Sequence, residues 1–282
     1  MPLGGISSLV AKDAANVHAM GKWSVDLPSD APEFSSTATA KGKARVAGNS
    51  DWSGSVEAYG HTPVIKPGDA FAFHGSLEGV NGISGNVIAS GVAINIAQEG
   101  GEPIKHVISF EGNGVPTLGA EAGVADAVVQ TPYSPLELPV KWTAIETATP
   151  VEVTLADVRS VALSISRVLH PYASSSTAKV KKRIAGPWDS EATVAFYVTD
   201  PALIPVRGLM YTLKLYATAS TYWDINYAIL QDISGIEVDR ETGAIIACTL
   251  KFMFSSVGMV GAAPGTPTAG YIKAPGAVSW FP

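Results

Sequence analysis

Two stretches of sequence decide the fold: residues 39–59, TAKGKARVAGNSDWSGSVEAY, and residues 177–197, TAKVKKRIAGPWDSEATVAFY. They align without a gap at an offset of 138, and ten of the twenty-one positions are identical. Chance pairing at ordinary residue frequencies would give roughly one or two identities. The shared positions include Lys41/Lys179, Lys43/Lys181, Arg45/Arg183, Gly48/Gly186, Asp51/Asp189 and Val56/Val194. The repeat predicts two copies of one structural unit.

A second repeated block follows each of these stretches. Residues 94–110, INIAQEGGEPIKHVISF, align with residues 236–252, IEVDRETGAIIACTLKF, at an offset of 142. Because the order and spacing of both blocks are kept, we interpret the chain as a tandem duplication of a domain of about 120 residues, an ordinary domain size. The predicted boundaries are residues 1–122 for the first domain, 123–148 for a proline-rich linker, and 149–282 for the second domain with its C-terminal tail.

Composition favours an all-β fold. Of the 282 residues 46% are hydrophobic and only 16% charged, which argues against a disordered chain or a coiled coil. The 28 glycines and 19 prolines follow no collagen period, so they indicate many turns between short elements. The segments around Val25, Val56, Leu163 and Val194 alternate apolar and polar residues with the period of a strand.

The second block predicts a hairpin in each copy, with turns at residues 98–101 and 240–243. Glycine at the last turn position, Gly101 in the first copy, would supply a positive φ. We expect at most one short helix per domain. The segments that could hold one are residues 151–168 and 222–231.

The sequence offers no cluster typical of an enzyme. Its five histidines have no metal-ligand spacing, and its glycine-rich pieces lack the lysine and helix of a phosphate loop. We therefore predict no catalytic, cofactor-binding or metal-binding residues. His106 is expected to be a structural histidine in a strand, and Cys248 a buried small apolar residue. The repeated acids Glu99/Glu241 and Asp51/Asp189 are interpreted as turn residues.

The net charge and the start of the sequence limit the classes of partner that we expect. The net charge of −6 disfavours a protein held on nucleic acid by a basic patch. The start of the chain lacks the pattern of a signal peptide, and no apolar run is long enough to cross a bilayer, so we expect a soluble protein made in a cytoplasm, with no membrane partner. A single cysteine excludes a disulfide framework.

The basic residues that recur between the copies are the main candidates for contacts. On a strand, alternate residues would project from one face, where they could touch phosphate or pair with acidic groups of an adjacent subunit. We favour a solvated hairpin or an inter-subunit contact over DNA binding. The candidates are Lys41, Lys43, Arg45, Lys179, Lys181 and Arg183. The C-terminal aromatics, Trp280 and Phe281, are expected to dock, preferably on their own chain.

The first copy resembles the tail tube proteins, also called major tail proteins, of long-tailed bacteriophages. The resemblance rests on residues 91–96, GVAINI, on residues 107–114, VISFEGNG, and on the upstream residues 51–56, DWSGSV. Domains of this family commonly end in such a hairpin followed by an FEGNG-like sequence. The second copy departs at this ending, with FMFSSVG at residues 252–258.

The resemblance implies a β-sandwich or half-barrel with one peripheral helix, whose inner sheet joins those of its neighbours around a lumen. It implies rings that stack into the tail tube of a siphovirus-like virion, assembled in the host cytoplasm. Members with tandem domains form trimers with pseudo-sixfold symmetry. Implied partners are other copies of the chain, the tape measure protein and other tail proteins, and viral DNA that passes without specific binding.

Physical reasoning supports a ring independently. Open sheet edges favour aggregation unless neighbours cover them, and repeated heterologous contacts generate rings. A net acidic wall would repel passing DNA, and Glu57 is the candidate lumen-facing residue. The alternatives are another tube-fold tail component, namely a terminator, a distal tail protein or the inner tube of a contractile system, or a carbohydrate-binding or adhesin module. The last would need an exposed aromatic platform, for which the candidates are Trp52, Trp188 and Trp223.

Overall fold

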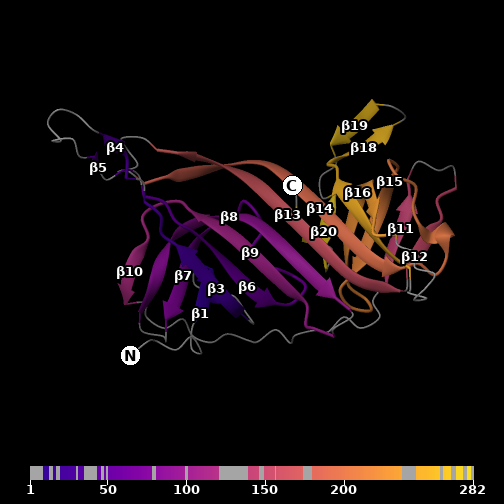
Figure 1. Cartoon of the computed structure of the whole chain (residues 1–282), viewed down its shortest axis with the longest axis horizontal. Coiled ribbons are helices and arrows are strands. Elements are labelled where there is room, and N and C mark those ends of the chain that lie inside the picture. Colours follow the sequence, from indigo (N-terminus) through magenta and orange to yellow (C-terminus); the bar gives the residue numbers. More distant parts are fainter. Residues whose placement is uncertain are drawn as a thin grey trace.

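The computed structural model describes residues 9–12, 15–16, 20–29, 31–34, 43–45, 48, 50–77, 81–98, 101–120, 139–145, 149–155, 157–173, 180–236, 246–260, 263–267, 271–275 and 278–280. This part of the chain confirms the all-β prediction. It holds one 17-stranded sheet whose strand pairs are antiparallel, two small two-stranded sheets, and a single 3-10 turn, η3 (Pro201–Leu203). Figure 1 shows two lobes connected by long strands.

The first lobe is built on five strands in the pairing order β3-β6-β9-β8-β7. Three short strands extend it: β1 pairs with β7 and with β2, and β10 pairs with β8. The bounds are β1 (Leu9–Lys12), β2 (Ala15–Asn16), β3 (Met20–Asp26), β6 (Ser53–Tyr59), β7 (Ala70–Leu77), β8 (Asn81–Ala97), β9 (Lys105–Gly112) and β10 (Thr117–Ala120).

The second lobe has the pairing order β13-β14-β17-β16-β15, which continues into β11 and β12. At the C-terminal end, β20 pairs with β16 and with β21. The bounds are β11 (Val140–Ala144), β12 (Glu152–Leu155), β13 (Val158–Tyr172), β14 (Lys182–Tyr197), β15 (Met210–Tyr216), β16 (Tyr222–Ser234), β17 (Ala247–Phe254), β20 (Ile272–Ala274) and β21 (Val278–Ser279). The small sheets are β4 (Glu33–Phe34) with β5 (Ala44–Arg45), and β18 (Val257–Val260) with β19 (Ala263–Pro267).

Strand registers agree between the two lobes. Val56 of β6 faces Ile108 of β9, and the repeat partners of these residues, Val194 and Leu250, also face each other. Two of the irregularities agree too. β3 and β13 each have a bulge at the start of their ladder, and β8 and β16 each have one near the middle of the strand. A bulge adds one residue to a strand and bends it, so matched bulges give matched curvature.

On the β8 side of the second repeated block, the sequence alignment at an offset of 142 is wrong by one residue. Val92 of β8 faces Ile108, whereas Ile233 of β16 faces Leu250. By register Val92 therefore corresponds to Ile233, while a constant offset of 142 would match it with Ser234. A one-residue slip moves a side chain to the other face of a sheet, so the structural correspondence is the one that keeps the apolar residues on the core side.

The first lobe curls on itself. Strands β3 and β7 lie at opposite ends of the five-strand order, and strands are spaced about 4.8 Å apart in a flat sheet. Even so, the rings of Trp23 in β3 and Phe73 in β7 lie 6.0 Å apart. Phe71 meets Phe110 edge to face at 6.4 Å, and Tyr211 meets Phe252 in the same way at 6.3 Å in the second lobe. Thus β7 packs over β9 in the first lobe, and β15 packs over β17 in the second.

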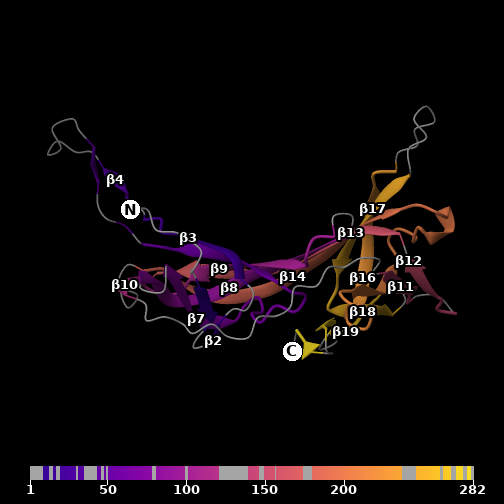
Figure 2. The ribbon, with the colours of Figure 1, turned by 90° about the horizontal axis from the view of Figure 1, so that it is seen from below.

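The lobes are joined by a strand ladder between β8 and β13. Its register runs from Ala97 opposite Ser160 to Gly91 opposite Ser166. One continuous cluster of buried apolar side chains passes beneath this seam and includes Val92, Ile94 and Leu163. Figure 2 shows β13 and β14 extending from the second lobe across to the first.

Several sequence predictions differ from the structure or fall outside its described part. The two segments considered for a short helix are strands, in β12 and β13 and in β16, because their alternating residues bury one face in the core. Strand β11 lies inside the predicted linker, residues 123–148, and pairs with β15. Gly101 has a φ of 58°, which confirms the expected turn glycine; Gly243, Glu99 and Glu241 lie outside the described residues. Trp280 is buried against Trp223, so it docks on its own chain as predicted.

Candidate assembly surface

Arg183 is the centre of the main polar contact between the lobes. It lies near the start of β14, at the end of the β13–β14 hairpin, and its side chain is only 5% exposed. Its guanidinium donates hydrogen bonds to both carboxylate oxygens of Asp51, at 2.8 and 2.9 Å. It also donates to the carboxylate of Glu111 and to the carbonyl oxygen of Gly112. A fork-shaped cation bound by two carboxylates fixes the hairpin firmly in place.

The socket for Arg183 is made by the segments that carry the family resemblance. Asp51 and Trp52 come from one of them, and Glu111, Gly112 and Asn113 from the other. The Trp52 indole donates to the carbonyl of Gly114, and a side chain at Gly112 would collide with the Trp52 ring at 2.1 Å. The oxygen of Asn113 accepts from the Arg183 backbone N–H at 3.1 Å. The EGN sequence therefore seats Trp52 and receives the hairpin.

The other basic candidates occupy different surroundings. Lys181 lies 3.4 Å from the Asp51 carboxylate and supports the same contact. Lys43 and Arg45 are 70% and 62% exposed, and in this chain both pair with Glu33 across the β4–β5 hairpin. Lys41 and Lys179 lie outside the described residues. Among the described members of the repeated cluster, Arg183 is buried and Lys181 half-buried in the second copy, whereas Lys43 and Arg45 are exposed in the first.

Among the open sheet edges of the described strands, two lie at equivalent places in the first and second copies of the joint. β3 pairs with β6 on one side only. After Ile229, β16 pairs with β17 on one side, while its other side has no described partner. Exposed apolar residues lie beside both edges: Leu27 follows β3 and is 45% exposed, and Ile236 follows β16 and is 50% exposed. Such edges are sites for pairing with another chain.

A polar face runs across the joined strands on the side opposite to the core. The registers place its residues opposite one another from β3 through the seam to β16. Glu57 lies on this face, half-buried between Lys22 and Val107. The neutral members are mostly small, among them Ser24, Ser55, Ser109, Ala93, Asn95, Ala162, Ser164, Thr193, Ala195 and Thr249.

Carboxylates outnumber lysines on the described part of this polar face. The acids are Asp26, Glu57, Glu111, Asp189, Glu191 and Asp232, and the lysines are Lys22, Lys105 and Lys251. Glu111 is neutralised by Arg183, and Glu191 forms an ion pair with Lys251 at 2.9 Å. Arg159 adds a cation to this face, where it lies over the ring of Tyr197. The remaining charges nearly balance, so this surface has no basic patch that would hold a polyanion.

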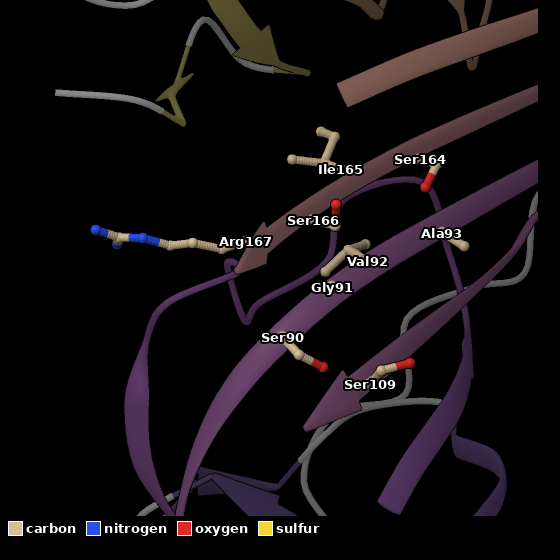
Figure 3. Close-up of a pocket in the computed structure, with 9 residues that line it drawn as sticks. All are labelled: Ser90, Gly91, Val92, Ala93, Ser109, Ser164, Ile165, Ser166 and Arg167. Carbon is tan, nitrogen blue, oxygen red and sulfur yellow. The ribbon is translucent and has the colours of Figure 1, made fainter. Parts of the chain in front are cut away.

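A shallow hollow marks the end of the seam. Its volume is about 390 Å³, and β8, β9 and β13 contribute to its lining. Figure 3 shows small residues such as Ser90, Ser109 and Ser166 around it, with the Arg167 side chain directed away from the serines. The Arg167 guanidinium stacks 4.7 Å from the Trp188 ring and donates to the carbonyl of Gly186. The hollow thus contains hydroxyls but no ionisable group that faces them among its lining residues.

The buried titratable groups act as structural residues. His106 is 3% exposed, and its Nδ1 lies 3.0 Å from the carbonyl oxygen of Gly60, which confirms its prediction as a structural histidine. Burial lowers the pKa of His106, and it also lowers the pKa of His61. Cys248 is buried in β17, as predicted, and burial raises the pKa of its thiol.

Within the described ranges, no three His, Cys, Asp or Glu side chains gather closely enough to hold a metal ion. None of the helices in this described part is long and apolar enough to span a membrane. Trp52 and Trp223 are fully buried, while Trp188 is half-buried beneath Arg167. Two of the three candidates for a sugar-binding platform are therefore core residues.

Comparison with known proteins adds no relative. No protein-family model matches the chain, and no curated protein is similar to it.

Proposed function

We propose that this chain is a structural virion protein, the tail tube protein of a siphovirus-like phage. In this proposal it consists of two tandem tube domains of the sandwich or half-barrel type, with the boundaries given above. Rings of three chains have pseudo-sixfold symmetry and stack into a tube that conducts DNA into the host. Its partners are other copies, the tape measure protein and other tail proteins.

The observation that carries the proposal is the seam between β8 and β13. By register β8 corresponds to β16 and β13 corresponds to β3. The seam therefore joins one edge of the first unit to the opposite edge of the second. The equivalent edges, on β16 in the second copy and on β3 in the first, have no described partner on that side. The pairing that β8 and β13 form inside one chain can therefore form again between β16 of one chain and β3 of another.

A joint of this kind is heterologous, because it brings together two different edges. Heterologous contacts produce rings when the rotation between units closes, and open filaments when it does not. Six units in a ring correspond to three duplicated chains, so the duplication itself supports a trimer. Strand addition at an open edge supplies backbone hydrogen bonds, and the flanking Leu27 supplies apolar contact.

The polar face supports the choice of a conduit for DNA. It continues across the seam without interruption, and its neutral members are small side chains. It has no basic patch and carries the carboxylate of Glu57, so the phosphates of DNA would not adhere to it. In a closed ring this face lines the lumen, while the apolar core lies behind it.

Electron microscopy of the purified full-length chain at high concentration tests the proposal. We expect rings with threefold symmetry and a central channel that stack into tubes. Single rings that never stack would favour a tail terminator or distal tail protein instead. A chain that stays monomeric over the whole concentration range, and that binds sugars on a glycan array, would overturn the proposal in favour of a carbohydrate-binding module.

A further inference from the structure

We infer that the β4–β5 hairpin is a docking arm, and that its Lys43 and Arg45 bind Asp189 of the next chain. This inference rests on the proposed ring, and it names the polar contact that holds the ring together. It concerns a hairpin that packs against neither lobe in Figure 1, where β4 and β5 extend away from the main sheet.

The hairpin has an equivalent that is already docked. Glu33 pairs with Arg45 across β4 and β5, and Pro171 pairs with Arg183 near the end of the β13–β14 hairpin. Pro171 lies 138 positions after Glu33, and Arg183 lies 138 positions after Arg45, which is the offset of the sequence repeat. The two hairpins therefore share length and register. One extends across the neighbouring lobe, and the other extends into solvent.

Three residues of the docked contact are repeated. Arg183 and Lys181 both contact Asp51, and their counterparts are Arg45, Lys43 and Asp189. A solvated hairpin would place no such demand on both copies, because exposed lysines and arginines are interchangeable with many polar residues. Retention of both basic positions and of the acid is expected if each copy offers an arm and a socket.

The acceptor has the same local geometry in both sockets. Asp51 accepts a hydrogen bond on Oδ1 from the N–H of Trp52 at 2.8 Å, and Asp189 accepts one on Oδ1 from the N–H of Ser190 at 2.9 Å. This bond fixes the carboxylate and leaves Oδ2 available for an incoming cation. Asp189 is exposed in the single chain, on the polar face opposite Ser166 of β13.

The socket around Asp189 lacks the second carboxylate that Glu111 supplies to the socket around Asp51. Glu111 faces Ser53, and by the β14–β17 register the corresponding position is occupied by Met253, so the socket on the second copy offers one carboxylate instead of two. Glu33 on the arm itself supplies the second carboxylate to Arg45. The joint between chains therefore keeps the charge balance of the internal joint but has fewer bonds across it, which suits an assembly that forms from free subunits.

A charge-swap experiment on the full-length protein tests the inference. The variants are Arg45→Asp, Asp189→Arg and the double variant, and the readout is the concentration at which rings form, measured by sedimentation velocity. We expect each single change to raise that concentration at least about tenfold, and the double variant to return to within about threefold of the parent, because close charge pairs at interfaces couple strongly. Melting temperatures of the unassembled variants should match that of the parent, since both sites are exposed.

The outcomes separate this inference from the proposed function. If the parent forms threefold rings and the single variants assemble as well as the parent, the arm does not bind Asp189 and the inference is wrong while the ring stands. If the double variant assembles no better than either single one, the two residues do not face each other and the inference is again wrong. If the parent forms no ring at all, the proposed function fails and the inference fails with it.

Discussion

The guanidinium of Arg183 is bound to both carboxylate oxygens of Asp51, at 2.8 and 2.9 Å, across 132 positions of sequence. Arg183 lies in the second copy of the sequence repeat and Asp51 in the first, so one bidentate ion pair links the two lobes. Both residues recur at the equivalent exposed sites, as Arg45 and Asp189. This asymmetry between a buried and an exposed version of the same pair allows each to serve as the control for the other.

Neutralising the buried acid should destabilise the chain. Asp51→Asn keeps the oxygen that accepts from Trp52 but leaves Arg183 short of one carboxylate, and breaking a buried ion pair costs about 3 kcal/mol. Asp189→Asn is the matched control and should change stability by less than about 0.5 kcal/mol, as exposed substitutions do. Urea unfolding at a concentration where the chain is monomeric measures both. Equal losses from the two variants would contradict the buried role of Asp51.

Glycine is required where Phe110 crosses β6. A side-chain carbon at Gly54 would lie 2.3 Å from the Ser24 carbonyl and 2.5 Å from the Phe110 ring, which is too close for either to remain in place. We expect Gly54→Ala to cost about 1–3 kcal/mol, the usual cost of overpacking. At Gly91 the nearest atom would be 3.5 Å away, so Gly91→Ala should be tolerated. Thermal unfolding of the two variants should separate them clearly, and equal melting temperatures would contradict the packing described.

Stability should fall as the solution becomes mildly acidic. Burial lowers the pKa of His106 in the folded chain, so below its unfolded pKa, about 6.5, the unfolded state binds more protons. The stability present at neutral pH is therefore lost as the pH falls from about 7 through the folded pKa. Unfolding free energies of the parent and of His106→Gln, measured between pH 8 and 5, should show a smaller slope for the variant. His61 shifts in the same direction, so some slope should persist. Identical slopes would show that His106 is not responsible.

The open edge on β3 should be sensitive to charge in assembly but not in folding. Leu27 is 45% exposed in the single chain, so Leu27→Lys should shift its stability by less than about 0.5 kcal/mol. In a ring this lysine would lose water at the strand joint, a known device against edge pairing. Ring formation, followed by light scattering, should be suppressed by this change. Val115→Lys, at an exposed site away from both edges, is the control that should assemble normally.

The sequence repeat predicted much of the local pairing. The repeat matches Val56 with Val194 and Ile108 with Leu250. Val56 faces Ile108 in the first lobe, and Val194 faces Leu250 in the second. Alternation of apolar residues also predicted the strand around Val56, in which Val56 and Ala58 are buried. These features follow from internal repetition or from a period of two along the chain, so they can be predicted from a single sequence.

Long-range features could not be predicted in the same way. Nothing local indicates that β8 pairs with β13, because an open strand edge accepts many partners. Trp52 looked like a possible surface platform, yet it is buried because Gly85 and Gly112 leave space for its ring. The shift of Val92 to Ile233 instead of Ser234 follows from the register of β16 against β17, which sequence alignment without a gap cannot reveal.

A cryo-EM reconstruction of the assembled protein, at a resolution that separates strands, tests the central claim most directly. The account predicts three chains per ring, with β3 of one chain hydrogen-bonded to the end of β16 of the next in the register of the internal seam. By that register Leu27 lies opposite Ile233 of its neighbour, and the polar face that contains Glu57 lines the channel. A ring in which the chains meet through other surfaces, or in which the polar face points outward, would contradict the account.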